Sequence, residues 1–129
     1  MNPERRQTPR VSERLSLSVG DDDAAIHTET MNLSAAGVYC VLERCIAPMT
    51  KLQLELELPG RPKITRVRCC GVVVRAEAFM PHPEVVPPPA QPRFQTAILF
   101  TELAPRDRQA ISAFVRDRLA SSSPPPASP

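Results

Sequence analysis

The chain of 129 residues is poor in aromatic side chains. It contains no tryptophan, one tyrosine and four phenylalanines, so it offers few of the flat platforms on which proteins stack the bases of single-stranded nucleic acids. Its formal net charge is only +2, whereas a dedicated binder of duplex DNA usually carries a stronger basic surface. We therefore expect no nucleic acid polymer among its partners.

Long apolar runs are also absent. No stretch of about 18 uninterrupted apolar residues occurs, which argues against a transmembrane helix and against membrane insertion. The N-terminus is rich in arginine and lacks the apolar segment of a secretory signal peptide. The sequence therefore predicts a cytoplasmic protein, and its length favours one domain.

Signatures of catalysis and of metal binding are missing as well. The four cysteines, Cys40, Cys45, Cys69 and Cys70, include no CxxC pair, and we expect them to be reduced and to act as small hydrophobic residues. His27 is predicted to be a surface residue. No nucleophile stands beside a base in any recognisable pattern, so we expect neither an enzyme nor a metal protein.

What the chain does contain is a series of alternating segments. Residues 51–58 place leucine at every second position, a spacing that fits one face of a strand and not one face of a helix. Similar alternation or β-rich composition predicts further strands at 11–19, 24–31, 38–42, 64–78 and 93–100. Within the segment 64–78, Gly71 indicates a bulge or a close approach of two backbones.

Ten of the sixteen prolines lie in two stretches, an exposed loop at 79–92 and a tail at 121–129. Between them, a helix is expected to begin near Pro105 and to carry Ile111, Phe114, Val115 and Leu119 on one stripe. We therefore predict an all-β fold, a small six-stranded antiparallel barrel with one C-terminal α-helix. Residues 1–10 would form a flexible basic arm, residues 11–120 the barrel with its helix, and residues 121–129 a disordered tail.

Two short clusters carry the chemistry of a binding site. The arm contains Arg5, Arg6 and Arg10, whose guanidinium groups bind phosphate with two parallel hydrogen bonds and stack on flat rings. The run 32–37, which we predict to be a turn between two strands, contains an amide, a hydroxyl and a glycine, contributed by Asn32, Ser34 and Gly37. Together the two clusters predict a site for a small molecule that is both aromatic and anionic.

The patterns Arg6-x-x-x-Arg10 and Asn32-x-Ser34-x-x-Gly37 resemble the two-part signature of the PilZ domain. The resemblance extends over about residues 3–119. It implies a six-stranded barrel with a C-terminal helix, and a receptor for the bacterial second messenger cyclic di-GMP. The ligand carries two guanines on a ring of two phosphodiesters, and no other cofactor is expected.

The resemblance also implies roles for individual residues. Arg6 and Arg10 would clamp phosphate and contact guanine. Asn32 and Ser34 would contact guanine or backbone, the neutral Asn32 offering a single acceptor oxygen where relatives with aspartate offer two. Gly37 would keep the barrel surface open for the ligand.

Two further positions follow from the same resemblance. Arg75 stands where relatives often carry a large aromatic or basic residue facing the ligand. Arg5 directly precedes the signature, and in relatives a basic residue there accompanies the binding of an intercalated ligand dimer.

The expected mechanism is an ordering of the arm over the ligand, which changes the surface offered to an unknown effector protein. One alternative remains open, a PilZ-fold module that binds protein partners and no nucleotide, because the chain is rich in exposed proline segments. Calorimetric titration with cyclic di-GMP separates the two.

Overall fold

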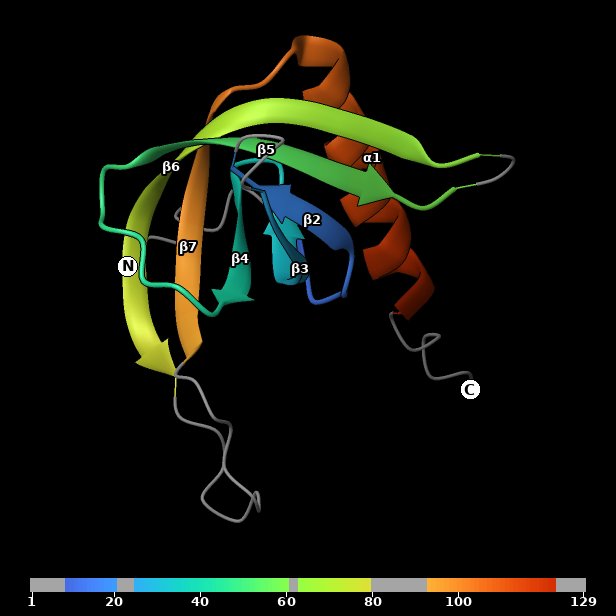
Figure 1. Ribbon diagram of the computed structural model, residues 1–129. Helices are drawn as coiled ribbons and strands as arrows, with labels where there is room; N and C mark the ends of the chain where they lie inside the picture. The colour runs from blue at the N-terminus through green and yellow to red at the C-terminus, as the bar shows by residue number, and fades with distance from the viewer. Residues whose placement is uncertain (1–8, 21–24, 61–62, 80–92, 123–129) are drawn as a thin grey trace, which may run out of the picture.

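The structure, a computed structural model, describes residues 9–20, 25–60, 63–79 and 93–122. Arg5 and Arg6, the proline-rich loop from residue 80 and the tail from residue 123 lie outside these ranges. The described chain forms seven strands and one helix (Figure 1): β1 (Arg10–Val11), β2 (Ser16–Val19), β3 (Ile26–Ser34), β4 (Gly37–Leu42), β5 (Lys51–Leu58), β6 (Thr65–Phe79), β7 (Arg93–Glu102) and α1 (Pro105–Ser122).

Six of the strands close into a barrel. Antiparallel pairing runs from β3 through β2, β5, β6 and β7 to β4, and a further pairing of β3 with β4 joins the two ends. The short strand β1 is an addition that pairs with the end of β3. The predicted six-stranded antiparallel barrel with one C-terminal helix is therefore confirmed, and closure removes the exposed sheet edges that invite aggregation.

The barrel interior is filled by the apolar side chains that alternate along each strand. On β5, Leu54, Leu56 and Leu58 are buried, while the intervening glutamates are partly exposed. The other strands contribute their own inward residues to the same core, namely Leu17, Val19, Leu33, Val38, Cys40, Leu42, Val67, Val73, Ile98 and Phe100. The period of two in the sequence therefore predicted which residues form the core.

The single strand expected at residues 11–19 is wrong in one respect, because residues 12–15 interrupt it between β1 and β2. The pairing with β3 shifts by one residue across this gap, since Val11 faces Leu33 but Ser16 faces Glu29. The hydroxyl of Thr30, which is 1% exposed, accepts a bond from Leu15 N and donates to Glu13 O. Together with the backbone hydrogen bond from Thr30 N to Leu15 O at 2.9 Å, this buried hydroxyl joins the two segments where the regular strand pairing breaks.

Helix α1 lies alongside the barrel (Figure 1) and packs against β1 and β3. Ile111 and Val115 are buried, and Phe114 and Leu119 pack against the core, so the predicted apolar stripe is confirmed. The helix extends through Ser122, past the predicted boundary at residue 120. Among the described residues, no helix has the length and apolar character needed to cross a membrane.

Gly71 has the role that its position in a strand predicted. The register of β6 against β7 shifts between Cys70 and Gly71. A Cβ atom on Gly71 would lie 2.7 Å from Ile98 Cγ2 and 2.9 Å from Leu54 Cδ1. The close approach to a neighbouring backbone is present, since Leu99 O lies 3.0 Å from the same Cβ position. The extra residue of the bulge is Thr101 on β7, because Cys70 faces Glu102 and Gly71 faces Phe100.

Candidate functional site

The segment predicted as a turn, residues 32–37, is mostly strand. Asn32 and Ser34 belong to the end of β3, Gly37 begins β4, and only Ala35 and Ala36 turn the chain. The strand extends this far because Asn32 pairs with Tyr39 and Leu33 with Val38. The motif is therefore the tip of a tight hairpin between two strands of the barrel.

The hydroxyl of Ser34 holds this tip together. Ser34 is 4% exposed, and its Oγ accepts hydrogen bonds from Ala36 N at 3.1 Å and from Gly37 N at 3.3 Å. Hydroxyls that bond to backbone two or three residues ahead are a common device for fixing turns. The structure therefore gives Ser34 a structural task, which is to set the shape of the loop.

Gly37 is required by the neighbouring strand. A Cβ atom at this position would lie 2.3 Å from Ile98 O on β7 and 3.2 Å from Leu99 Cα. Such a contact is far shorter than any real Cβ contact, and the atoms that it meets are backbone. A residue without a side chain thus allows β4 to pair closely with β7.

One row of residues crosses four strands on the outside of the barrel. Asn32 on β3 faces Tyr39 on β4, Tyr39 faces Ala97 on β7, and Ala97 faces Arg75 on β6. The sequence neighbours Leu33, Val38 and Ile98 are buried in the core, so Asn32, Tyr39 and Ala97 face outward. Arg75 is exposed and joins the same face because the register of β6 shifts after the buried Val73. It assembles an amide, an aromatic ring and a guanidinium around a small alanine.

Two members of this row, Tyr39 and Arg75, are linked across Ala97. The guanidinium of Arg75 donates a hydrogen bond to the hydroxyl of Tyr39. Its Cζ atom also lies 5.6 Å from the centre of the Tyr39 ring, within the range of cation–π attraction. The ring and the guanidinium therefore form one connected polar and flat surface.

A second bulge in β6 widens this surface. The register of β6 against β7 shifts between Val73 and Arg75, which leaves Val74 as the additional residue. Bulges frequently redirect side chains near functional sites. Val74 is 49% exposed, and Leu99 on the adjacent strand is 46% exposed, so apolar side chains lie open to solvent beside the polar row.

These features surround a hollow of about 180 Å³. Four of the residues predicted from the sequence, together with the apolar surface just described, line this hollow. The four are Arg10, Asn32, Ser34 and Gly37, and the other lining residues are Ala36, Val38, Tyr39, Val74, Ala97, Ile98 and Leu99. Arg10 joins them because it is the strand partner of Ser34. The two halves of the motif thus meet at one place in the fold.

Tyr39 is the residue that the sequence did not indicate as part of the site. It is the only tyrosine in the chain, and it stands two residues after Gly37, on the outward face of β4. Its proximity to Arg75 depends on the register of three strands, which the sequence does not reveal. Arg75, in contrast, was predicted; the structure places it against Tyr39, which lines the hollow, but Arg75 is not itself a lining residue.

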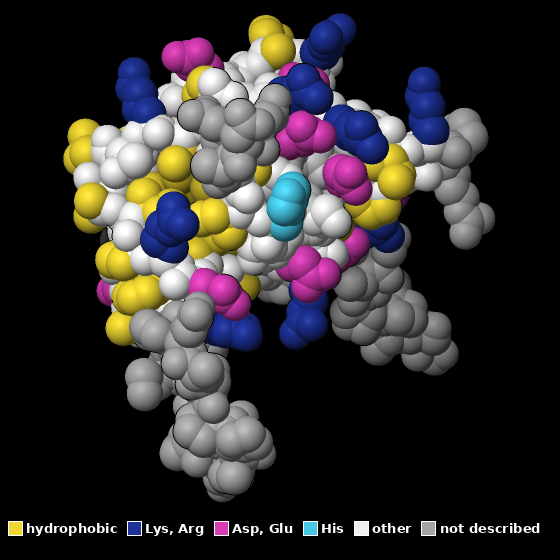
Figure 2. All heavy atoms as spheres, viewed as in Figure 1, with side chains coloured by type: hydrophobic (Ala, Val, Ile, Leu, Met, Phe, Trp, Pro, Cys, Tyr) yellow, Lys and Arg dark blue, Asp and Glu magenta, His cyan; other side chains and the backbone are white. Residues whose placement is uncertain are grey.

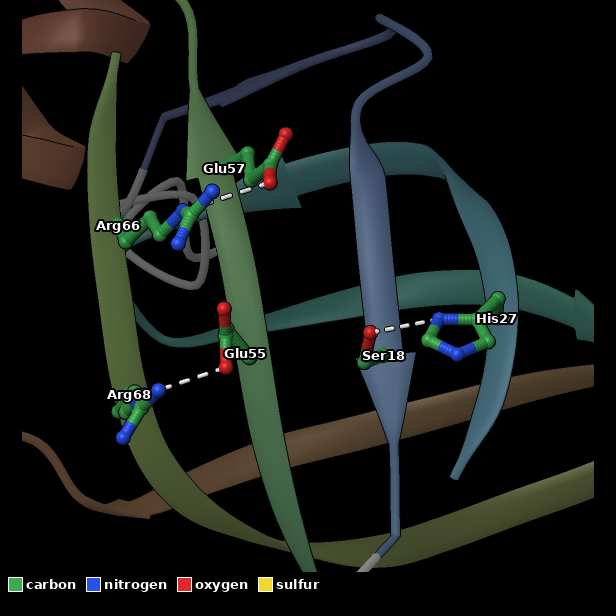
Figure 3. A network of polar contacts seen from close by, with 6 residues as sticks. All are labelled: Ser18, His27, Glu55, Glu57, Arg66 and Arg68. Carbon is green, nitrogen blue, oxygen red and sulfur yellow. Dashed lines mark hydrogen bonds and ion pairs between the residues drawn. The ribbon is translucent and has the colours of Figure 1, made fainter. Parts of the chain in front are cut away.

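A larger hollow, of about 530 Å³, lies over β2, β5 and β6 and is lined mainly by polar and charged residues. Figure 2 shows this face, where acidic and basic side chains are interspersed, while hydrophobic side chains gather toward the left of the view. The charges largely pair with each other (Figure 3), as Arg68 lies 3.2 Å from Glu55 and Arg66 lies 3.5 Å from Glu57. Exposed pairs of this kind contribute little stability.

The same face contains a serine and a histidine in contact. Ser18 Oγ lies 2.9 Å from Nδ1 of the exposed His27 ring. In catalytic triads a third group orients the histidine, and in the described chain no hydrogen bond or ion pair to a carboxylate is recorded for this ring. The contact therefore matches a surface hydrogen bond better than a catalytic pair.

The cysteines differ in environment. Cys45 is exposed, whereas Cys40 is fully buried, so the prediction of small buried hydrophobic residues holds for Cys40 and is wrong for Cys45. Burial raises the pKa of the Cys40 thiol to about 12. Burial, together with the nearby Cys70 and Asp107, raises the pKa of Cys69 to about 11, so both thiols are poor nucleophiles at neutral pH. Within the described ranges, no three potential metal ligands gather.

Comparison with known proteins agrees with this geometry. The sequence model of the PilZ domain matches residues 4–117. The inhibitor of motility MotI/DgrA of Bacillus subtilis superposes with a TM-score of 0.75 at 23% identity, over 93% of this chain and 54% of that chain. This chain therefore spans about half the length of the Bacillus protein.

Two structures with cyclic di-GMP share the fold. The PilZ domain of YcgR from Escherichia coli with c-di-GMP matches with a TM-score of 0.64 at 13% identity, over 92% of this chain and 99% of that chain. The complex of K. pneumonia MrkH with c-di-GMP matches with a TM-score of 0.62 at 12% identity, over 92% and 54%. No curated protein sequence matches the chain. The family match over most of the chain, together with the closed barrel, shows that this protein belongs to the PilZ domain family.

Proposed function

We propose that this protein is a receptor for cyclic di-GMP, which it binds in the hollow between Arg10 and the row of Asn32, Tyr39 and Arg75. The observation that carries the proposal is the meeting of the two motif halves, because Arg10 and Ser34 are strand partners beside this hollow. The PilZ relatives with bound c-di-GMP support the same ligand class.

The chemistry of the lining suits each part of such a ligand. The exposed guanidinium of Arg10 binds a negatively charged phosphodiester with two parallel hydrogen bonds. The oxygen of the Asn32 side chain accepts a hydrogen bond from the N1 or N2 edge of guanine. Val74 and Leu99 offer apolar contact for the face of a base, and the Tyr39 ring with Arg75 offers a flat surface for stacking worth about 1 kcal/mol.

The size of the hollow indicates that further residues complete the site. Its volume is about 180 Å³, whereas pockets for small molecules usually enclose roughly 300–1,000 Å³. In the sequence, residues 1–8 are separated from the lining residue Arg10 by Pro9 alone. We propose that Arg6 and Arg5 of this arm cover the ligand, Arg6 on phosphate or guanine and Arg5 on a second, intercalated ligand molecule.

The proposal places the protein in the cytoplasm, where the messenger is found, and assigns it no reaction. Ordering of the arm costs on the order of 1 kcal/mol per residue, which the charge-assisted contacts must offset. The resulting change in surface would then be recognised by an effector protein.

Calorimetric titration with cyclic di-GMP tests the proposal. We expect Arg10→Ala and Arg6→Ala to weaken binding by about tenfold to a hundredfold, since each removes a hydrogen-bonded ion pair of about 1.5–3 kcal/mol. Arg14→Ala is the matched control, because Arg14 is exposed on the neighbouring segment and does not line the hollow. Equal affinity in all three variants would contradict the assignment, and no binding at all would favour the nucleotide-independent interaction module.

Two further measurements refine the site. Tyr39→Ala should weaken binding about fivefold through lost stacking, while Tyr39→Phe, which keeps the ring and loses only the hydrogen bond from Arg75, should weaken it less. A stoichiometry near two ligands per chain would support the role of Arg5, and a stoichiometry of one would refute it.

A further inference from the structure

A third hollow lies between the turn of residues 35–36 and helix α1. Its volume is about 350 Å³, and its lining residues are Pro9, Ala35, Ala36, Arg108, Ser112, Val115 and Arg116. Three elements far apart in the sequence form it: the residue before β1, the turn between β3 and β4, and one face of α1. It is distinct from the proposed nucleotide hollow, although the two adjoin.

The helix wall of this hollow is positively charged. Arg108, Ser112 and Arg116 follow each other at intervals of four residues, a spacing that places them on one stripe of a helix. Both arginines are exposed, and the lining contains no acidic side chain. The hollow therefore presents two guanidinium groups with a hydroxyl between them.

The floor of the hollow is apolar and fixed. Val115 is 1% exposed and belongs to the core, and Ala35 and Ala36 add two methyl groups. Arg108 is held in place because its Nη1 donates a hydrogen bond to Ala35 O at 3.2 Å. Arg116 makes no ion pair within the described part of the chain, which leaves its charge available to a partner.

The chemistry of this wall matches an acidic peptide segment better than a second nucleotide. Two guanidinium groups and a serine hydroxyl bind carboxylates well, and the small apolar floor accepts an aliphatic side chain. A nucleotide site would be expected to include an aromatic ring for the base, and the lining contains no aromatic side chain.

The two hollows share a wall. Ala36 lines both of them, and Pro9 of one directly precedes Arg10 of the other. The turn that carries Ala36 is also bonded to β7, through Phe100 N and Ala36 O at 2.9 Å. A ligand that displaces Arg10 or this turn will therefore alter the hollow on α1.

We propose that the hollow beside α1 docks an acidic segment of a partner protein, and that nucleotide binding changes the affinity of this docking. The docking site stands on the geometry of α1 and the turn alone. The coupling rests on the proposed function, since it requires cyclic di-GMP to occupy the adjoining hollow.

Fluorescence polarisation with a labelled peptide of alternating glutamate and leucine tests the docking site in the full chain. We expect Arg116→Glu to weaken binding about tenfold, because it converts an attractive exposed contact into a repulsive one. Arg106→Glu is the matched control, since Arg106 is exposed on the same helix, outside the lining, and its reversal changes the net charge equally. A peptide with glutamine in place of glutamate should bind at least about tenfold more weakly.

Equal losses in Arg116→Glu and Arg106→Glu would overturn the docking site, because they would show attraction to net charge alone. Amide NMR signals of Ala35, Ala36 and Ser112 that do not move with the peptide would overturn it as well. Repeating the titration with saturating cyclic di-GMP, its binding verified by calorimetry, tests the coupling. An unchanged peptide affinity would then refute the coupling, whereas failure of the nucleotide to bind would refute the proposed function and leave the docking result standing.

Discussion

Replacing Gly37 with alanine tests why the motif contains a glycine. If the glycine exists to clear space for a ligand, the substitution should weaken binding and leave the fold as stable as before. If it exists because β4 and β7 approach closely, the substitution should destabilise the barrel itself. The structure favours the second reason.

The geometry allows the cost to be calculated approximately. The added Cβ would lie 2.3 Å from Ile98 O, and ordinary contact begins at 3.4 Å, so the two strands must separate locally by about 1.1 Å. That displacement disrupts the ladder where Gly37 pairs with Leu99 and strains the adjacent bond from Phe100 N to Ala36 O. Overpacking costs about 1–3 kcal/mol and a weakened hydrogen bond about 1 kcal/mol, so we expect a loss of about 2–4 kcal/mol.

Urea unfolding followed by circular dichroism measures this loss. Against a total stability of about 5–15 kcal/mol and a slope of about 1–3 kcal/mol per molar urea, the midpoint should fall by about 1–2 M. Gly60→Ala is the matched control, because its Cβ would meet only Lys63 O, at 3.0 Å, and it should cost less than about 1 kcal/mol. A Gly37→Ala protein as stable as Gly60→Ala, with weaker nucleotide binding, would refute the argument from strand packing.

Three further substitutions test separate features of the fold. Ser34→Ala should cost about 1–2 kcal/mol in urea unfolding, because the amides of Ala36 and Gly37 lose their acceptor; an unchanged midpoint would show that water replaces the hydroxyl. Thr30→Val should cost about 1–3 kcal/mol, since it leaves Leu15 N without its buried partner, and faster amide hydrogen exchange at Leu15 would locate the effect. Burial raises the pKa of the Cys40 thiol from 9.0 to about 12. Between these two pH values, the folded state therefore keeps the thiol proton and the unfolded state loses it. Stability should therefore fall by about 1.4 kcal/mol for each pH unit above about 9, and a Cys40→Val protein should lack this part of the fall; equal slopes in the two proteins would refute it.

The parts of the fold that the sequence predicted are those set by local periodicity. Residues 51–58 alternate without interruption, and the strand has the predicted bounds. The helix stripe of Ile111 and Val115 was equally visible, because a period of 3.6 and a starting proline depend on nearby residues alone. Closure of the barrel followed from the number of short strands and the turns between them.

The errors arise where a side chain or a register shift replaces the regular pattern. The alternation of residues 11–19 continues through the break between β1 and β2, since Val11, Leu15 and Leu17 are all buried. Only the position of Thr30, distant in sequence, reveals that the backbone ladder stops there. Likewise, the polar residues of the motif suggested a turn, whereas their cross-strand partners extend β3 to Ser34.

The sequence predicted a set of residues for the candidate site, but their arrangement depends on how the strands pair, which the sequence does not show. Asn32, Tyr39, Ala97 and Arg75 come from four strands, and a shift of one residue in any pairing would turn its member of the row toward the core. The bulge at Val74 is such a shift, because it allows Arg75 to face outward beside Ala97 while Val73 remains buried.

Ser34 and Gly37 act on the site through the backbone, because they fix the hairpin tip and its distance from β7. The motif therefore joins residues that line the hollow and would face the proposed ligand, such as Arg10 and Asn32, with residues that hold the strands at the spacing this arrangement needs. A search for the signature alone cannot separate these two kinds of residue, but the stability and affinity measurements above can.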